Sequence, residues 1–202
     1  MIDKINSIFK SRKPNILGHY NKNSVMIPLC SRGEELNLLF EVRSLNLKHQ
    51  PGDICFPGGK LEKGETPKDT AIRETMEELN LNKEDIEFIG DMDYLVTPYN
   101  FIMYPFICKL NKEDITPSKE EVDHVFEVPL KFFMEKEPVL HKLKIVPHPE
   151  EDFPYNLIRG GENYKFRRGK MPEYFYIYED YTIWGFTALI IKKFTDIIRN
   201  EM

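Results

Sequence analysis

Hydrophobic and polar positions along the chain follow two periods, which predict a mixture of strands and helices. Alternating or block-like runs of branched and aromatic residues are typical of strands. Such runs occur at Val25–Leu29, Leu36–Val42, Ile86–Tyr94, Ile102–Leu110, Leu140–Val146, Tyr174–Tyr178 and Tyr181–Trp184. Apolar residues at helical spacing predict helices at about 2–10, Pro67–Leu79, Leu130–Glu135 and about 186–199. The combination favours an α/β (α+β) fold. The length of 202 residues is ample for one core, so we expect a single domain over 1–202.

The stretch from Pro147 to Pro172 interrupts this pattern with proline, glycine and charged residues. We expect it to form one long loop, and long loops often carry function. Its cations Arg159, Arg167 and Arg168 are candidates for holding an anionic substrate, but a solvated loop is the preferred interpretation.

The helix predicted at Pro67–Leu79 carries an acidic face. Glu74, Glu77 and Glu78 have the spacing i, i+3 and i+4, which places their carboxylates on one side of a helix. The opposite side, which we expect to be buried, carries Ile72, Met76 and Leu79. Like charges at these spacings destabilise a helix by roughly 0.2–0.5 kcal/mol per pair. A helix that keeps them is a candidate site for a hard cation such as Mg²⁺ or Mn²⁺. For three glutamates alone, the usual alternative is a solvated surface.

The residues around the acidic face resemble the Nudix box, Gly-x5-Glu-x7-Arg-Glu-U-x-Glu-Glu-x-Gly-U, in which U is a bulky apolar residue. The box would span 59–81, with matches at Gly59, Glu65, Arg73, Glu74, Glu77, Glu78 and Leu81. Two positions depart from it, because Thr75 replaces a bulky apolar residue and Asn80 replaces the late glycine. Asparagine also adopts the left-handed conformation that ends helices, so we expect the helix to end there.

The resemblance implies a Nudix fold, a mixed β-sheet sandwiched between α-helices, and hydrolysis of a nucleoside diphosphate linked to another group. It implies that the metal ions are held by the carbonyl of Gly58 and by Glu74, Glu77 and Glu78. These ions would neutralise diphosphate oxygens and lower the pKa of the attacking water. Arg73 would orient the glutamates through charge-assisted hydrogen bonds. Glu65 would cap or brace the junction between loop and helix.

The segment before the box resembles the coenzyme A pyrophosphatase signature, Leu-Leu-Thr-x-Arg-(Ser/Ala)-x3-Arg-x3-Gly-x3-Phe-Pro-Gly-Gly. Counted from Leu39, the matches are Arg43, Ser44, Gly52 and Phe56–Gly59. The departures are Phe40 for a leucine, Glu41 for a threonine and Lys48 for an arginine. Lysine keeps the charge but lacks the bidentate fork of arginine, so phosphate recognition there is expected to be weaker or different.

Arg43, Ser44 and Lys48 are therefore our candidates for substrate binding. The two cations place positive charge shortly before the metal turn, where a diphosphate or an extra phosphate needs it. The alternative is that they are ordinary surface cations at the end of a strand.

Two further candidates lie downstream. In many Nudix enzymes a glutamate from a late loop completes the metal site or acts as general base, and Glu121 is our candidate, with Glu120 second. The alternative is a solvated acidic loop. Trp184, at the start of the last predicted helix, is a candidate for stacking on adenine, although a core position is the preferred interpretation.

Composition adds several expectations. The net charge of −5 gives no support to nucleic-acid binding, and no apolar run has the length of a membrane span. Three cysteines without metal-type spacing favour a reducing compartment, and Cys55 is expected to be a buried strand residue rather than a nucleophile. No targeting segment is evident, so we expect a cytoplasmic protein. The oligomeric state stays open, with a homodimer as a candidate because homodimers are common in the family.

The resemblances together predict a Mg²⁺- or Mn²⁺-dependent pyrophosphatase that cleaves coenzyme A or a derivative to 3′,5′-ADP and a 4′-phosphopantetheine product. Hydrolysis of ADP-ribose or another nucleoside diphosphate derivative is the alternative within the same class. A non-catalytic ligand-binding module is the second class. The complete Arg-Glu-x-x-Glu-Glu run argues against it, because a pure binder does not need all three carboxylates.

Overall fold

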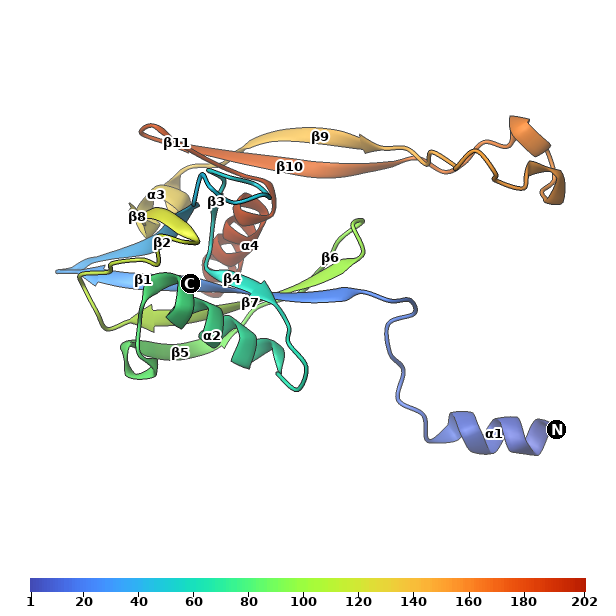
Figure 1. The fold of residues 1–202 in the computed structure, drawn as a ribbon, viewed down its shortest axis with the longest axis horizontal. Helices are drawn as coiled ribbons and strands as arrows, with labels where there is room; N and C mark the ends of the chain where they lie inside the picture. Colours follow the sequence, from blue (N-terminus) through green and yellow to red (C-terminus); the bar gives the residue numbers. More distant parts are fainter.

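A computed structural model describes residues 1–202, and its largest element is an eight-stranded sheet (Figure 1). The strands are β1 (Asn21–Arg32), β2 (Glu35–Arg43), β3 (Ile54–Cys55), β4 (Gly58–Lys60), β5 (Ile86–Asp91), β6 (Leu95–Val96), β7 (Phe101–Leu110) and β8 (Val122–Pro129). The order across the sheet is β3-β2-β1-β7-β5, with β4 beside β1, β6 beside β7 and β8 beside β2. β1 and β7 are parallel and the other pairs are antiparallel, so the sheet is mixed.

Helices cover both faces of this sheet (Figure 1). α2 (Pro67–Leu79) packs on one face, and α3 (Leu130–Glu135) and α4 (Gly185–Glu201) pack on the other. Alternation along β2 separates the two hydrophobic clusters. Leu38 and Phe40 belong to the cluster of α4, whereas Leu39 belongs to the cluster that includes Ala71 and Leu79 of α2. The predicted α+β fold, a mixed sheet between helices, is confirmed.

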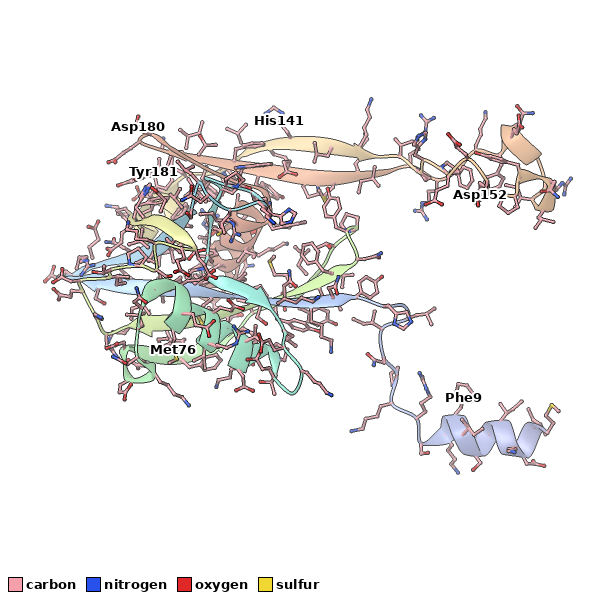
Figure 2. The ribbon with its side chains drawn as sticks, viewed as in Figure 1. Phe9, Met76, His141, Asp152, Asp180 and Tyr181 are labelled. Atoms are coloured by element: carbon pink, nitrogen blue, oxygen red, sulfur yellow. The ribbon has the colours of Figure 1, made fainter.

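A second sheet consists of β9 (Val139–Ile145), β10 (Gly169–Tyr178) and β11 (Tyr181–Trp184), all antiparallel. β11 lies over the body near α4, whereas β9 and much of β10 extend away as a two-stranded arm (Figure 1). The distal turn of the arm holds Asp152, and α1 (Ile2–Lys10) holds Phe9; both lie apart from the body (Figure 2). No residue of α1 is buried.

The prediction of one long loop over Pro147–Pro172 is wrong at its end. Residues 169–172 belong to β10 because Gly169 pairs with Ile145 and the pairing continues along the arm. Two short 3-10 helices, η2 (Tyr155–Leu157) and η3 (Gly161–Asn163), interrupt the remaining loop. The strand predicted at Ile86–Tyr94 ends earlier, at Asp91. Cys55 lies in the short strand β3, as expected for a strand residue, whereas β4 and β6 were not predicted.

Local sequence explains the bounds of α2. The Thr66 hydroxyl accepts a hydrogen bond from the Asp69 N–H, and the Asp69 carboxylate accepts one from the Thr66 N–H, which forms a capping box. Pro67 occupies the first turn, where its missing N–H is not needed. The helix ends at Asn80, whose φ of 49° and ψ of 51° are left-handed, as expected for the asparagine in place of glycine.

The expected burial of α2 is only partly correct. Leu79 is buried, but Ile72 and Met76 are half-exposed and border a shallow surface groove. The buried side consists of Thr70, Ala71, Thr75, Glu78 and Leu79. The small residues Ala71 and Thr75 let the helix approach the sheet, and this turns Glu78 inward.

None of the helices combines the length and the apolar character that a membrane span requires.

Candidate active site

The turn that carries Gly58 and Gly59 is held between β1 and α2. Gly58 pairs with Val25 of β1, and a Cβ on Gly58 would come within 2.2 Å of the Ser24 carbonyl oxygen. A Cβ on Gly59 would come within 2.2 Å of Glu74 Oε1. The backbone N–H of Gly58 donates to the Glu78 carboxylate at 2.8 Å. Glycine is therefore required at position 58, where backbone atoms crowd it, whereas at position 59 the end of the Glu74 side chain would have to move.

Arg73 ties the loop before α2 to the acidic face. Its guanidinium binds both carboxylate oxygens of Glu65, at 2.7 and 3.2 Å. Nη1 also lies 2.9 Å from Glu74 Oε1 and 2.9 Å from Glu77 Oε2. Glu65 in turn accepts hydrogen bonds from the Thr70 hydroxyl and the Glu62 N–H, so it braces the loop. Arg73 thus fixes the carboxylates by charge-assisted hydrogen bonds, the geometry expected of an orienting residue.

The three glutamates of the acidic face lie in different environments. Glu77 is exposed, Glu74 is half-buried, and the Glu78 side chain is only 4% exposed. Burial raises the pKa of Glu74 and raises that of Glu78 strongly, and the neighbouring Glu41 raises the Glu78 pKa further. Protons therefore neutralise part of this charge in the absence of a cation, and a bound divalent cation would displace them.

The residues present fit a hard divalent cation. Every side-chain donor of the acidic face is a carboxylate oxygen, and the glycine turn leaves no room for side chains between them. Glu41, which is 1% exposed, has Oε2 without a hydrogen-bond partner in the chain. Buried polar atoms are normally satisfied, so this oxygen is available to a ligand. The side chains are not grouped in a finished coordination sphere, and Glu74 and Glu77 form ion pairs with Arg73.

The upstream substrate candidates separate in the structure. Arg43, at the end of β2, is half-buried and lines the cleft described below, with Nε lacking a hydrogen-bond partner in the chain. Ser44 is buried, and its N–H donates to the Glu121 carbonyl at 2.8 Å. Lys48 is exposed on the following loop and does not line the cleft. The structure therefore brings Arg43 to the site and leaves Lys48 outside it.

The loop before β8, which carries Glu120 and Glu121, reaches the same site. The Ser44–Glu121 backbone bond holds the loop beside the end of β2. The Glu121 side chain is exposed, and its charge is near enough to raise the pKa of Glu74 and of Glu78. Glu120 is exposed as well.

A cleft of about 790 Å³ opens beside the glycine turn. Its apolar wall comes from β7, from the turn between β6 and β7, and from α4. The residues of this wall are Tyr99 in the turn, Phe101 and Met103 on β7, and Phe186 and Leu189 on α4. Trp184 also lines it and is 45% exposed, so the preferred core interpretation is wrong. Its ring stacks on Phe175 of the second sheet, with centroids 6.0 Å apart. That stacking holds the indole at the surface of the cleft instead of in the core.

The remaining candidates lie away from the cleft or are chemically inert. Arg159, Arg167 and Arg168 are exposed in the distal part of the arm and do not line the cleft. The three cysteines are free. Cys55 lies on β3, half-buried, and burial raises the pKa of its thiol well above the usual range. A thiol of this kind is not an activated nucleophile.

Sequence reasoning missed Glu41 and Ser24 as residues of this site. Both are buried, and both have a side-chain oxygen without a partner in the chain. A signal for Glu41 existed in the sequence, since a lone glutamate interrupts the apolar run Leu38–Phe40 and Val42 of β2. Ser24 carries no comparable signal.

Comparison with known proteins identifies the class that this fold and site define. The NUDIX domain model matches residues 20–148, well over half of the chain. The chain therefore belongs to the Nudix family, as the box at 59–81 indicated.

Among curated relatives, the peroxisomal coenzyme A diphosphatase NUDT7 of Mus musculus is 38% identical over 142 residues, covering 66% of this chain and 56% of the mouse protein. The mitochondrial coenzyme A diphosphatase NUDT8 of Homo sapiens is 30% identical over 175 residues, covering 84% of this chain and 66% of the human protein. The chain thus spans little more than half the length of the mouse relative. A MutT/nudix family protein from Enterococcus faecalis has a TM-score of 0.54 at 14% identity, covering 98% of this chain and 70% of that chain. This likeness concerns the fold alone.

Proposed function

We propose that the protein is a Mg²⁺- or Mn²⁺-dependent Nudix hydrolase that cleaves the diphosphate of coenzyme A or a coenzyme A derivative. The products are 3′,5′-ADP and a 4′-phosphopantetheine. The observation that carries the proposal is the junction of Glu74, Glu78 and the glycine turn beside a cleft that Arg43 also lines. The coenzyme A diphosphatase names of two relatives support the choice of substrate.

The residues of the chain have distinct roles in this mechanism. Glu74, Glu77 and Glu78, with the carbonyl of Gly58, would hold the cation. When bound, the cation would neutralise diphosphate oxygens and acidify the attacking water. Arg73 keeps the carboxylates oriented through its bonds to Glu65, Glu74 and Glu77. Glu121 is the candidate base that takes the proton from the water, because its flexible side chain stands at the edge of the site.

The cleft suits a ligand with a charged end and an apolar end. Arg43 supplies positive charge beside the glycine turn, and the aromatic wall around Phe101 and Phe186 supplies apolar surface. A volume of about 790 Å³ is within the range typical of small-molecule sites. Trp184 offers an exposed indole face on which an adenine could stack.

A substrate panel tests this function directly. Coenzyme A, ADP-ribose, NADH and a diadenosine polyphosphate are incubated with the protein and Mg²⁺ or Mn²⁺, and products are identified by mass spectrometry. We expect 3′,5′-ADP and 4′-phosphopantetheine from coenzyme A. Preferential cleavage of ADP-ribose would replace the substrate assignment and keep the reaction class. Cleavage of none of these would favour the alternative of a non-catalytic binding module.

Two variants make the panel specific for the acidic face. Glu77→Gln and Glu78→Gln each remove a charged ligand and should lower kcat strongly while the far-UV spectrum is unchanged. Glu84→Gln, on the exposed helix η1 (Lys83–Asp85), is the matched control and should keep full activity. Full activity in both ligand variants would mean that the acidic face is only solvated surface.

Three expectations accompany the proposal. The homodimer stays a prediction, which light scattering would test. Cytoplasmic location also stays a prediction. The names of the two relatives assign those proteins to peroxisomes and mitochondria. Adding acylated and oxidised coenzyme A to the panel would test which form of coenzyme A the protein cleaves.

A further inference from the structure

Glu41 is a buried glutamate on the face of β2 that α2 covers. Leu39, two residues earlier on the same face, packs in the cluster of Ala71 and Leu79 of α2. Side chains two residues apart on a strand point to the same side, so Glu41 also points toward α2. Its charge is the second largest cause, after burial, of the raised Glu78 pKa.

The surroundings of Glu41 contain an unusual concentration of unsatisfied polar atoms. Four buried side-chain nitrogen or oxygen atoms of the whole chain have no hydrogen-bond partner in it. Three of them are Glu41 Oε2, Ser24 Oγ and Arg43 Nε. Ser24 pairs with Gly59 of the turn, and Arg43 lies two residues after Glu41 at the end of β2, past an irregularity in the pairing with β8. Unsatisfied buried groups cost about 1–3 kcal/mol each. A cation would satisfy Glu41 Oε2 and Ser24 Oγ, whereas the Arg43 N–H is a donor that an anionic substrate would satisfy.

The other oxygen of Glu41 is fixed. The Cys55 thiol donates to Glu41 Oε1 at 3.1 Å, and Cys55 is the strand partner of Glu41 in the β2–β3 pair. This contact holds the carboxylate with Oε2 directed away from the thiol. The side chain is thus oriented, nearly solvent-free and free to coordinate through one oxygen.

We propose that Glu41 is a further ligand of the divalent cation, which binds between β2 and α2 through Glu41 Oε2 and the Glu78 carboxylate. This inference rests on the proposed metal-dependent function. Glu41 adds a carboxylate from β2 to those of α2, and Ser24, which pairs with Gly59 of the turn, carries a buried hydroxyl on β1. A strand residue thereby joins the ligands that α2 supplies. The threonine that the coenzyme A pyrophosphatase signature has at this position would supply no charge.

Mn²⁺ binding, followed by electron paramagnetic resonance of free Mn²⁺ and by the Mn²⁺-induced rise in Tm, tests the proposal without substrate. Glu41→Gln keeps the size of the side chain and should weaken Mn²⁺ binding on the order of ten- to a hundredfold. The apo protein should become more stable at the same time, because a like charge beside Glu78 is removed. Glu41→Thr, the signature residue, should weaken Mn²⁺ binding equally and covers the case in which the glutamine variant does not fold.

Control variants separate the outcomes. Glu127→Gln changes a glutamate of the same sheet that pairs with Arg32 on β1, and it should bind Mn²⁺ as the wild type does. Glu78→Gln should weaken Mn²⁺ binding whether or not Glu41 is a ligand. Loss of Mn²⁺ binding in Glu78→Gln together with unchanged binding in Glu41→Gln and Glu41→Thr would overturn the inference alone. A wild-type protein that binds no Mn²⁺ would overturn the proposed function as well.

A purely structural role for Glu41 makes the opposite prediction. If the carboxylate only accepts the Cys55 hydrogen bond, Glu41→Gln should leave the Mn²⁺ affinity unchanged, because the amide oxygen of glutamine can accept the same bond. Cys55→Ala removes that hydrogen bond but leaves the carboxylate, so it should retain Mn²⁺ binding within a few-fold of the wild type. Strong loss of binding in Cys55→Ala with none in Glu41→Gln would contradict the proposal.

Discussion

Glu74 Oε1 occupies the space that a side chain at position 59 would need, since a Cβ built on Gly59 would stand 2.2 Å from it. The loop before α2 and the acidic face of α2 are therefore in direct contact at this glycine. The contact brings the turn and the helix together although the two residues are fifteen positions apart in sequence.

Gly59→Ala should move the Glu74 carboxylate and leave the fold in place, because the clashing atoms are the end of a flexible side chain. We expect kcat with Mn²⁺ to fall at least about tenfold, since a misplacement of about 1 Å in a catalytic group can cost a hundredfold. Gly90→Ala is the control, because a Cβ there meets nothing within 4 Å. Equal kinetics of the two variants would remove Glu74 from the site.

Arg43→Ala should lower kcat/KM for coenzyme A far more than for dephospho-coenzyme A, if Arg43 binds the 3′-phosphate. Loss of one charge-assisted contact corresponds to about 1.5–3 kcal/mol, or roughly ten- to a hundredfold in kcat/KM. The guanidinium lines the cleft and its Nε is unpaired within the chain. Equal losses on both substrates would assign Arg43 to the diphosphate that they share.

Lys48→Ala should change kcat/KM for coenzyme A by no more than about twofold. The sequence resemblance made Lys48 a substrate candidate, but the residue is exposed and outside the cleft, and exposed charges contribute little. The kinetics are measured at low and high ionic strength, because screening would reveal a weak long-range contribution. A tenfold loss at low salt would show that the loop carrying Lys48 closes over the substrate.

Glu65 should make the stability of the metal-free protein depend on acid pH. Hydrogen bonds from Arg73, Thr70 and the Glu62 N–H lower the pKa of Glu65 from 4.5 to about 2. Because the folded pKa lies below the ordinary value, the contribution is complete above about pH 4.5 and is lost as the pH falls toward about 2. The Tm of the wild type should therefore approach that of Glu65→Gln over this window.

Thermal unfolding between pH 7 and pH 2.5 measures that convergence. Glu62→Gln is the control, because Glu62 contributes only its backbone N–H to the contact and its side chain is exposed. A difference in Tm between wild type and Glu65→Gln that stays constant with pH would contradict the assignment.

Local signals in the sequence were sufficient to predict where α2 begins and ends. The capping residues Thr66 and Asp69, Pro67 in the first turn and Asn80 at the end lie within one helix, so their interactions depend on neighbours three to five positions away. The same locality underlies the i, i+3, i+4 spacing of Glu74, Glu77 and Glu78, although Glu78 lies on the buried side of α2 and Glu77 is exposed. The Nudix motif added the connection to the glycine turn, and the family match bears out that resemblance.

Contacts between distant segments decided which residues are buried and which residues of the arm form strands. Glu78 is buried and Glu77 is exposed because α2 packs on the sheet through the side that carries Ala71 and Thr75. The helical spacing alone does not specify which side packs. Residues 169–172 become strand because they pair with β9, more than twenty residues earlier. Glu41 points toward α2 because β2 packs under that helix, and Lys48 lies on an exposed loop outside the cleft. The sequence thus determined the elements and the chemistry of the motif, whereas the tertiary structure decided which charged groups share a buried space, because burial and long-range pairing are properties of the packed chain.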